Sequence, residues 1–366
     1  MHLKLTMAAA AAFLIAGQAA ARDFSIDNLT ARYGEGITWA SINNAGELIG
    51  MNADRGVELR LRSGSVTLSP GEDFNANYPG VLGNDGSAYI IRQTPEFESQ
   101  SWRRAPDGTL TPVHGLANSP YPSGNVSAVN DSGIAVGSAM NNLGYYRAVV
   151  YQGGNAIDLG TARGESSAYG INNNGTIVGA YQIGNYVNEA FIYSNGQLTT
   201  FGGADSTAKH INDANVVAGE KIFDNSGPMP HAYTRAFLYE NGATTYISVD
   251  GKRDTHVLDL NNSGMVLGTA SNGFEAYDYF LYFQGETILL KDILAAEGYA
   301  GWSIDGAIGL NDNDQLIVHA LNNATGEARE LLLSTAALPV PEPGTWAMLL
   351  AGLGCVGMLK RRARAA

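Results

Sequence analysis

Residues 42–50 read Ile-Asn-Asn-Ala-Gly-Glu-Leu-Ile-Gly, and variants of this stretch return along the chain. The shared pattern is an apolar residue, two Asn or Asp positions, a short turn that usually contains Gly, and apolar residues that usually end in Gly. Complete copies follow at 129, 171, 211, 260 and 310, and a degenerate copy, one residue short, starts at Gly83. The seven starts are 40 to 50 residues apart, which indicates an internal repeat.

Each copy predicts a β-hairpin. Asn and Gly tolerate the left-handed conformation that a tight turn needs, and β-branched or apolar residues flank the turn. A second hairpin follows in most copies, such as residues 190–193 and 197–201 around Ser-Asn-Gly. Four short strands in about 45 residues are the content of one propeller blade. The sequence therefore predicts an all-β fold, a seven-bladed β-propeller.

The ends of the repeat region predict how the ring closes. After the last copy, three strands are expected, at 306–310, 315–320 and 328–333, and one strand is missing. Residues 24–29, Phe-Ser-Ile-Asp-Asn-Leu, form an expected strand before the first copy with no partner there. We expect this stretch to supply the outer strand of the last blade, since pairing the two termini covers exposed sheet edges. A solenoid of stacked hairpins is the competing architecture.

The repeats also resemble a known family. Residues 193–203, Tyr-Ser-Asn-Gly-Gln-Leu-Thr-Thr-Phe-Gly-Gly, followed by Ile211-Asn-Asp, are similar to the HAF extracellular repeat of secreted bacterial proteins. The likeness spans residues 24–333, although the namesake His-Ala-Phe is replaced, for example by Arg147-Ala148-Val149. The resemblance implies a propeller-like fold and an extracellular location, and it implies no activity.

Composition excludes several classes of function. The chain has 366 residues, 45 Gly, 30 Asn and a net charge of −13. Between residues 22 and 338 there are 17 basic and 34 acidic residues, so this body carries −17. An acidic body repels nucleic acids, and we expect no nucleic-acid partner. The single cysteine, Cys355, excludes an intramolecular disulfide and a cysteine zinc site.

The N-terminus has the pattern of a secretory signal peptide over residues 1–21. Lys4 supplies the positive charge, residues 7–16 form a ten-residue apolar core, and Ala19 and Ala21 are the small residues before the cleavage site. Cleavage after Ala21 would leave an exported body of residues 22–338.

The C-terminus carries a second targeting pattern. Residues 339–344 are a stiff Pro-rich linker, and the segment 345–366 contains an uncharged apolar stretch and then Lys360, Arg361, Arg362 and Arg364. The stretch 345–359 is short for a hydrocarbon core of roughly 30 Å, but flanking basic side chains can extend it. We expect one transmembrane helix, with the basic tail in the cytoplasm and the body outside.

This terminus resembles the PEP-CTERM sorting signal of Gram-negative bacteria, with Pro341-Glu342-Pro343 as its motif. The resemblance implies recognition by an exosortase, a membrane protease that removes the tail. The body would be anchored at the inner membrane, facing the periplasm, before processing, and would then lie at the cell surface or in the medium. A plain anchor that is never cut is the alternative.

Catalytic and metal-binding motifs are weak in this sequence. His114, His210, His231, His256 and His319 show no metal-ligand spacing, so we assign no catalytic residue and expect no cofactor. Asp312 and Asp314 are weak calcium candidates, because their loop lacks the bidentate Glu of an EF-hand, and turn formation alone explains these residue types.

The sequence favours a non-enzymatic binding or structural protein, and the PEP-CTERM context implies an association with exopolysaccharide or biofilm matrix. The alternative is a carbohydrate-active hydrolase or lyase on the same scaffold. A cluster of carboxyl groups with perturbed pKa values in one cleft would favour the enzyme.

Overall fold

The structure is a computed structural model, and it describes residues 24–69, 76–93, 99–121, 123–161, 164–184, 187–223, 232–273 and 276–335. Residues 26–334 form one compact unit. The signal peptide, the sorting linker and the expected membrane helix lie outside the described residues. Among the described helices, none has the length and apolar character needed to cross a membrane.

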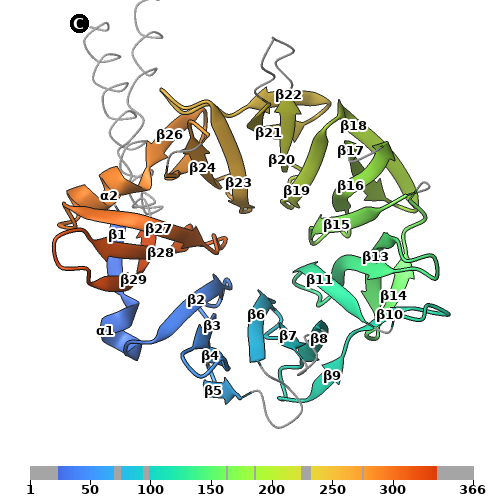
Figure 1. Cartoon of the computed structure of the whole chain (residues 1–366), viewed down its shortest axis with the longest axis horizontal. Helices are drawn as coiled ribbons and strands as arrows, with labels where there is room; N and C mark the ends of the chain where they lie inside the picture. The colour runs from blue at the N-terminus through green and yellow to red at the C-terminus, as the bar shows by residue number, and fades with distance from the viewer. Residues whose placement is uncertain are drawn as a thin grey trace, which may run out of the picture. The chain divides into compact units, whose positions relative to one another are not determined.

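Seven β-sheets stand radially around a central axis (Figure 1). Sheet A contains, in spatial order, β1 (Phe24–Asn28), β29 (Ala328–Thr335), β28 (Gln315–Asn322) and β27 (Trp302–Ile308). Sheet B contains β2 (Ile37–Ile42), β3 (Leu48–Asn52), β4 (Val57–Leu61) and β5 (Gly64–Leu68). Sheet C contains β6 (Ala76–Leu82), β7 (Ala88–Gln93), β8 (Ser99–Arg104) and β9 (Leu110–Pro112). Sheet D contains β10 (His114–Leu116), β14 (Asn155–Asp158), β13 (Tyr146–Gln152), β12 (Ala135–Met140) and β11 (Gly124–Val129).

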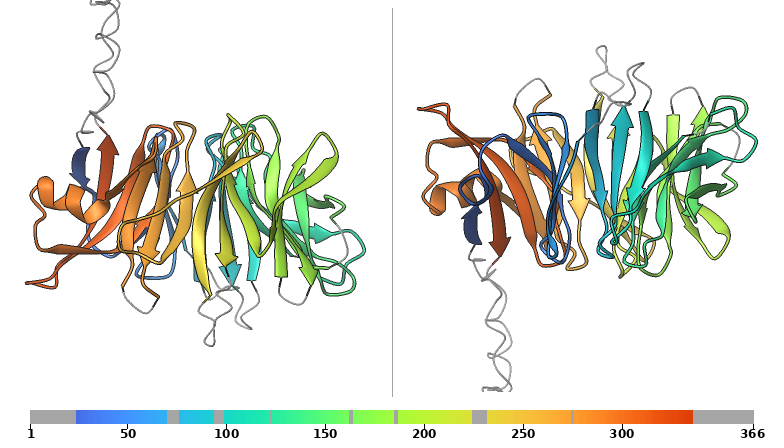
Figure 2. Two further views of the ribbon diagram at one scale, coloured as in Figure 1. Left: turned by 90° about the horizontal axis from the view of Figure 1, so that it is seen from above. Right: turned by 90° about the horizontal axis from the view of Figure 1, so that it is seen from below.

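Sheets E, F and G have four strands each. Sheet E contains β15 (Ser166–Ile171), β16 (Ile177–Gly184), β17 (Val187–Ser194) and β18 (Gln197–Ala204). Sheet F contains β19 (Ser206–Ile211), β20 (Val217–Phe223), β21 (Tyr233–Glu240) and β22 (Ala243–Tyr246). Sheet G contains β23 (Asp254–Leu260), β24 (Val266–Ser271), β25 (Asp278–Phe283) and β26 (Glu286–Leu289). The prediction of seven blades is confirmed, and the solenoid alternative is wrong, because the sheets close into a ring (Figures 1 and 2).

The two termini meet in sheet A, as the sequence predicts. The N-terminal strand β1 lies beside β29 as the outermost strand of the last blade. The expected strand is one residue too long, since Leu29 begins the short helix α1 (Leu29–Tyr33). Asn28 ends the strand because its side-chain oxygen caps the helix, accepting a hydrogen bond from the Ala31 amide at 2.9 Å.

The final Gly of the repeat has a packing role. Gly268 lies opposite Phe280 in the next strand, and a Cβ atom at Gly268 would come within 2.5 Å of the Phe280 ring. Phe280 is completely buried and shares a core cluster with Ala236 of sheet F and with Ile247, which directly follows the last strand of that sheet. The hydrophobic core is therefore divided into layers between neighbouring sheets, and each blade covers the apolar face of the next.

Three features differ from the sequence prediction. β10 adds a fifth strand to sheet D by pairing in parallel with β14, and the helix α2 (Leu290–Ala296) follows β26. The copy at 83 is not one residue short. The Asn43 side chain binds the Gly83 carbonyl, and the Gly83–Ser87 turn repeats the Asn43–Glu47 turn, so Leu82 is the apolar start and Gly83 stands where other copies have Asn.

Candidate functional site

The first Asn of each repeat joins its own blade to the next one. Asn172, for example, is 97% buried; its Oδ1 accepts hydrogen bonds from the amides of Asn174 and Thr176, and its Nδ2 donates to the Asn212 carbonyl of sheet F at 3.0 Å. Equivalent bonds, of 2.9 to 3.3 Å, run from Asn43, Asn130, Asn212, Asn261 and Asn311 to the next sheet. We call these six bonds the asparagine latches.

The second position of each repeat forms a ring of side chains at the same rim. Its members are, in order, Asn44, Asn84, Asp131, Asn173, Asp213, Asn262 and Asp312. Amide and carboxylate therefore alternate, except at Asn44 and Asn84. Asn173, for example, donates to Asp131 and to Asp213 at 2.8 Å in each case. Complementary donors and acceptors thus link neighbouring blades around this rim.

The two calcium candidates belong to these networks. Asp312 accepts hydrogen bonds from the side chains of Asn44 and Asn262 and from the Asn262 backbone amide. Asp314 accepts from Asn261 and Ser263. Their oxygens therefore face N–H and O–H donors, an arrangement that differs from a ring of oxygen ligands around a cation. Within the described ranges, no group of three or more metal-ligating side chains occurs.

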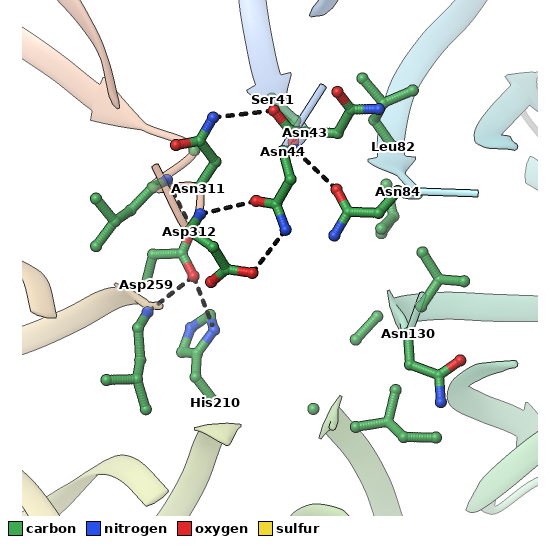
Figure 3. Close-up of a pocket in the computed structure, with 18 of the residues that line it drawn as sticks. Ser41, Asn43, Asn44, Leu82, Asn84, Asn130, His210, Asp259, Asn311 and Asp312 are labelled. Carbon is green, nitrogen blue, oxygen red and sulfur yellow. Dashed lines mark hydrogen bonds and ion pairs between the residues drawn. The ribbon is translucent and has the colours of Figure 1, made fainter. Parts of the chain in front are cut away.

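An axial cavity of about 440 Å³ lies at this rim (Figure 3). The ends of the seven innermost strands line it, and the His210–Asp259 pair faces into it, with Nδ1 and Oδ1 3.4 Å apart. Asp259 also accepts hydrogen bonds from the amides of Leu260 and Leu310. About 30% and 26% of the two side chains are accessible, through the cavity.

The surroundings of this pair favour its neutral form. Burial raises the pKa of Asp259 above its usual value, against the stabilising effects of His210 and of the two amides. Burial likewise lowers the pKa of His210, although the charge of Asp259 opposes this.

A second cavity, of about 660 Å³, lies at the opposite end of the inner strands, among sheets C, D and E. It contains the first residues of β11, whereas the asparagine latch of the same sheet follows its last residue. Among the described residues that line this cavity there are three tyrosines, six serines and no charged side chain. We call it the serine–tyrosine groove. Ser127 and Tyr169 line both cavities, so the groove adjoins the axial cavity.

The remaining predicted residues fall in different places. His114 starts β10, His256 lies in β23 with Nδ1 3.5 Å from Glu220, and His319 in β28 pairs with Glu330 at 2.6 Å. The structure thus brings no two of these histidines into one site within its described part. His231 lies outside the described residues, and so do Ala19, Ala21, Pro341, Glu342, Pro343, Lys360, Arg361, Arg362 and Arg364.

The sequence analysis missed the groove, and it recognised the Asn positions only as turns. The alternation of Asn and Asp at the second repeat position is visible in the sequence and could have indicated a ring of paired side chains. The groove has no comparable signal, because its residues come from three sheets and from non-repeating positions.

Comparison with protein families identifies the C-terminus. Residues 339–364 match the PEP-CTERM protein-sorting motif. The chain carries this sorting signal. It implies export, sorting to the cell surface and processing by an exosortase. The matched segment contains Pro341-Glu342-Pro343 and the basic tail, as the sequence resemblance suggests.

Comparison with solved structures supports the fold. The β-propeller domain of the trilobed protease from Pyrococcus furiosus, described as having an open velcro topology, has a TM-score of 0.56 at 12% identity, over 83% of this chain and 94% of that one. A prolyl endopeptidase (TM-score 0.55, 11% identity) and the Pyrococcus horikoshii acylaminoacyl peptidase (0.51, 13%) match over 83% and 81% of this chain.

These likenesses concern the propeller alone. The chain spans about half the length of the two peptidases, 50% and 51%. At such low identity the likeness indicates fold and carries no activity across. No curated protein sequence matches the chain.

Proposed function

We propose that this chain is an exported β-propeller displayed at the cell surface or released into the medium as a non-catalytic binding or structural component of an exopolysaccharide or biofilm matrix. The signal peptide would be removed after Ala21, and an exosortase would cut near Pro341-Glu342-Pro343. The sorting motif and the similarity of residues 24–333 to HAF repeats support this location.

One observation carries the non-catalytic assignment. The carboxylates of Asp131, Asp213 and Asp312 at the axial cavity accept hydrogen bonds from asparagine side chains of neighbouring blades. A carboxylate held in this way joins two blades and has few free lone pairs for a reacting proton. These residues thus fit a scaffold better than an acid–base pair.

The hydrolase alternative needs a protonated carboxyl group and an ionised carboxylate on either side of a glycosidic bond. Among the described residues lining the axial cavity, Asp259 is the carboxyl group whose pKa is raised, and the ionisable group paired with it is the imidazole of His210. A carboxyl–imidazole pair differs from the carboxyl pair of a glycosidase, which favours binding over hydrolysis.

The test uses residues 22–338, which contain the whole compact unit. This body is mixed with polysaccharide extracted from cultures of the bacterium that makes it, and co-sedimentation and newly formed reducing ends are both measured. We expect co-sedimentation without new reducing ends. Failure to bind the extract would contradict the proposal, and new reducing ends would favour the hydrolase.

Sorting is tested separately by mass spectrometry of the mature protein. We expect an N-terminus at residue 22 and a C-terminus that lacks Lys360 and the residues after it. A mature chain that retains this basic tail would favour the uncut anchor and contradict exosortase processing.

A further inference from the structure

The junction between sheets C and D lacks two connections that other junctions have. At the axial rim, Gly83 replaces the latch asparagine, so no side chain reaches from this position to the Asn130 carbonyl. Among the described residues, the one side-chain link across this rim is a 2.7 Å hydrogen bond from Asn84 Nδ2 to Asp131. The junction is therefore held less tightly there than its neighbours.

A second glycine removes a connection at the opposite rim. At the next three junctions, a side-chain hydroxyl at the start of the inner strand accepts a hydrogen bond from a backbone amide of the preceding blade. These hydrogen bonds, of 2.9 to 3.0 Å, run from the amides of Ala148, Ala190 and Ala236 to the hydroxyls of Ser166, Ser206 and Thr255, in that order. The equivalent position in β11 is Gly124, as the pairing of β11 with β12 shows. A Cβ atom there would lie 2.3 Å from the Tyr151 hydroxyl.

The serine–tyrosine groove opens where this second connection is absent. Gly124 lines it, and so does Ser101, which occupies the position equivalent to Ala148. Below Gly124, the buried Tyr151 hydroxyl lies 3.0 Å from the carbonyl oxygens of Asn125 and Ser138 and so ties β11 to β12. Two residues that line the groove, Asn125 and Ser138, are thus held in place, and the groove volume of about 660 Å³ is within the range of ligand pockets.

The groove presents unused polar and aromatic groups. Tyr121, Tyr146 and Tyr169 are 44%, 43% and 39% exposed. No hydrogen bond joins their hydroxyls, or those of the six serines, to another residue in the described part of the chain, and the three rings have no aromatic partner there. A hydroxyl can both donate and accept, and a tyrosine ring presents an apolar face beside a polar edge.

We propose that the serine–tyrosine groove binds an uncharged saccharide. A pyranose ring matches both groups, because its C–H face packs on an aromatic ring while its hydroxyls pair with serine and tyrosine hydroxyls. An ionic ligand would be desolvated there without a countercharge, and a polyanion would also meet the −17 charge of the body. This assignment rests on the proposed function and names its ligand class and site.

The chain offers a matched pair of variants. Tyr146 lines the groove, while its neighbour Tyr145 does not and is also exposed, at 49%. Binding of residues 22–338 is measured by calorimetry against uncharged hexasaccharides of glucose, mannose, galactose and N-acetylglucosamine, with a hexauronate as the charged probe. Extract binding is measured in parallel.

We expect at least one uncharged hexasaccharide to bind and the hexauronate not to bind. Tyr146→Ala should weaken binding about tenfold or more, and Tyr169→Ala should also weaken it, while Tyr145→Ala leaves Kd within about twofold of the wild type. Circular dichroism and the thermal midpoint check folding, and Tyr146→Phe, which keeps the ring, should retain most of the affinity.

The outcomes separate the two proposals. If the extract binds but Tyr146→Ala and Tyr145→Ala bind equally well, the groove assignment is wrong and the matrix-binding function stands. If no uncharged hexasaccharide binds, or the hexauronate binds better, the ligand class is wrong. If a tryptic digest of cell-surface protein displaces the bound extract from the groove and no saccharide displaces it, the groove is a peptide site and the assignment fails.

Discussion

The junction between sheets E and F and the junction between sheets C and D show how one repeat serves two purposes. At the first, Asn172 and Ser206 join the blades at the two rims, and Phe237 and Phe201 pack in the core between the sheets. At the second, Gly83 and Gly124 replace the two connecting side chains, and a groove is present at one rim. Junctions with both connections hold the ring together, while the junction that lacks them leaves room for a ligand beside Gly124.

The largest effect is expected from breaking a regular latch. Asn172→Ala removes two hydrogen bonds within the turn and the two that Nδ2 donates to the next blade, to the Asn212 carbonyl and to Asn215 Oδ1. It leaves the buried Asn212 carbonyl without this donor. We expect the free energy of unfolding to fall by about 3 kcal/mol in urea denaturation. Asn142→Ala, in an exposed turn, is the matched control and should change it by less than about 0.5 kcal/mol. Equal effects would mean that the latches contribute little.

A smaller effect is expected from repairing the degenerate junction. A Cβ atom at Gly83 would lie 2.4 Å from the Asp85 carboxylate, so Gly83→Asn is combined with Asp85→Ser, the residue that occurs at this position in the next copy. The pair should add a bond to the Asn130 carbonyl and raise the free energy of unfolding by about 1 kcal/mol. Loss of the 3.5 Å Arg103–Asp85 ion pair reduces this gain little, because both side chains are partly exposed. Asp85→Ser also removes the hydrogen bonds that Asp85 accepts from the Ser87 amide and hydroxyl. The new asparagine side chain should replace the amide bond, as Asn43 binds the Glu47 amide.

Asp85→Ser alone is the control for this repair. If the double variant is no more stable than the single one, the missing bond at Gly83 does not explain why this junction differs from the others.

The smallest effect concerns sheet A, where the two termini close the ring. Burial lowers the pKa of His319, but the hydrogen bond to Glu330, the charges of Glu330 and Asp305 and the Trp39 backbone outweigh burial and raise the pKa above its usual value. A raised folded-state pKa stabilises the fold fully below the unfolded pKa of about 6.5, and this contribution is lost as pH rises through the folded-state pKa.

The thermal midpoint of the wild type should therefore fall between pH 6 and pH 9 by more than that of His319→Gln. Glu58, Glu220 and Asp278 have lowered pKa values, so their contributions are lost at acid pH, outside this window. Parallel midpoint curves for the two proteins would show that His319 does not link pH to ring closure.

The sequence predicted the ring because the fold depends on local, repeated signals. The Asn-Asn-x-Gly turns and the pairing of residues 24–28 with the last blade follow from turn chemistry and from a count of strands. The blade-to-blade role of Asn172 was not predicted, because its partner is 40 residues away and depends on the radial geometry. The groove lies where Gly124 has no side chain to connect two blades, and such a missing connection is visible only when the junctions are compared in space.

Residue-resolved hydrogen exchange of residues 22–338 tests the central comparison most directly. At six of the seven positions, the backbone amide donates to a side chain of the next blade: Asn44, Asp131, Asn173, Asp213, Asn262 and Asp312. The Asn84 amide has no such partner in the part of the chain that the structure describes. We predict that the Asn84 amide exchanges at least about tenfold faster than the other six. Equal protection at all seven positions would contradict the account of an open junction in an otherwise latched ring.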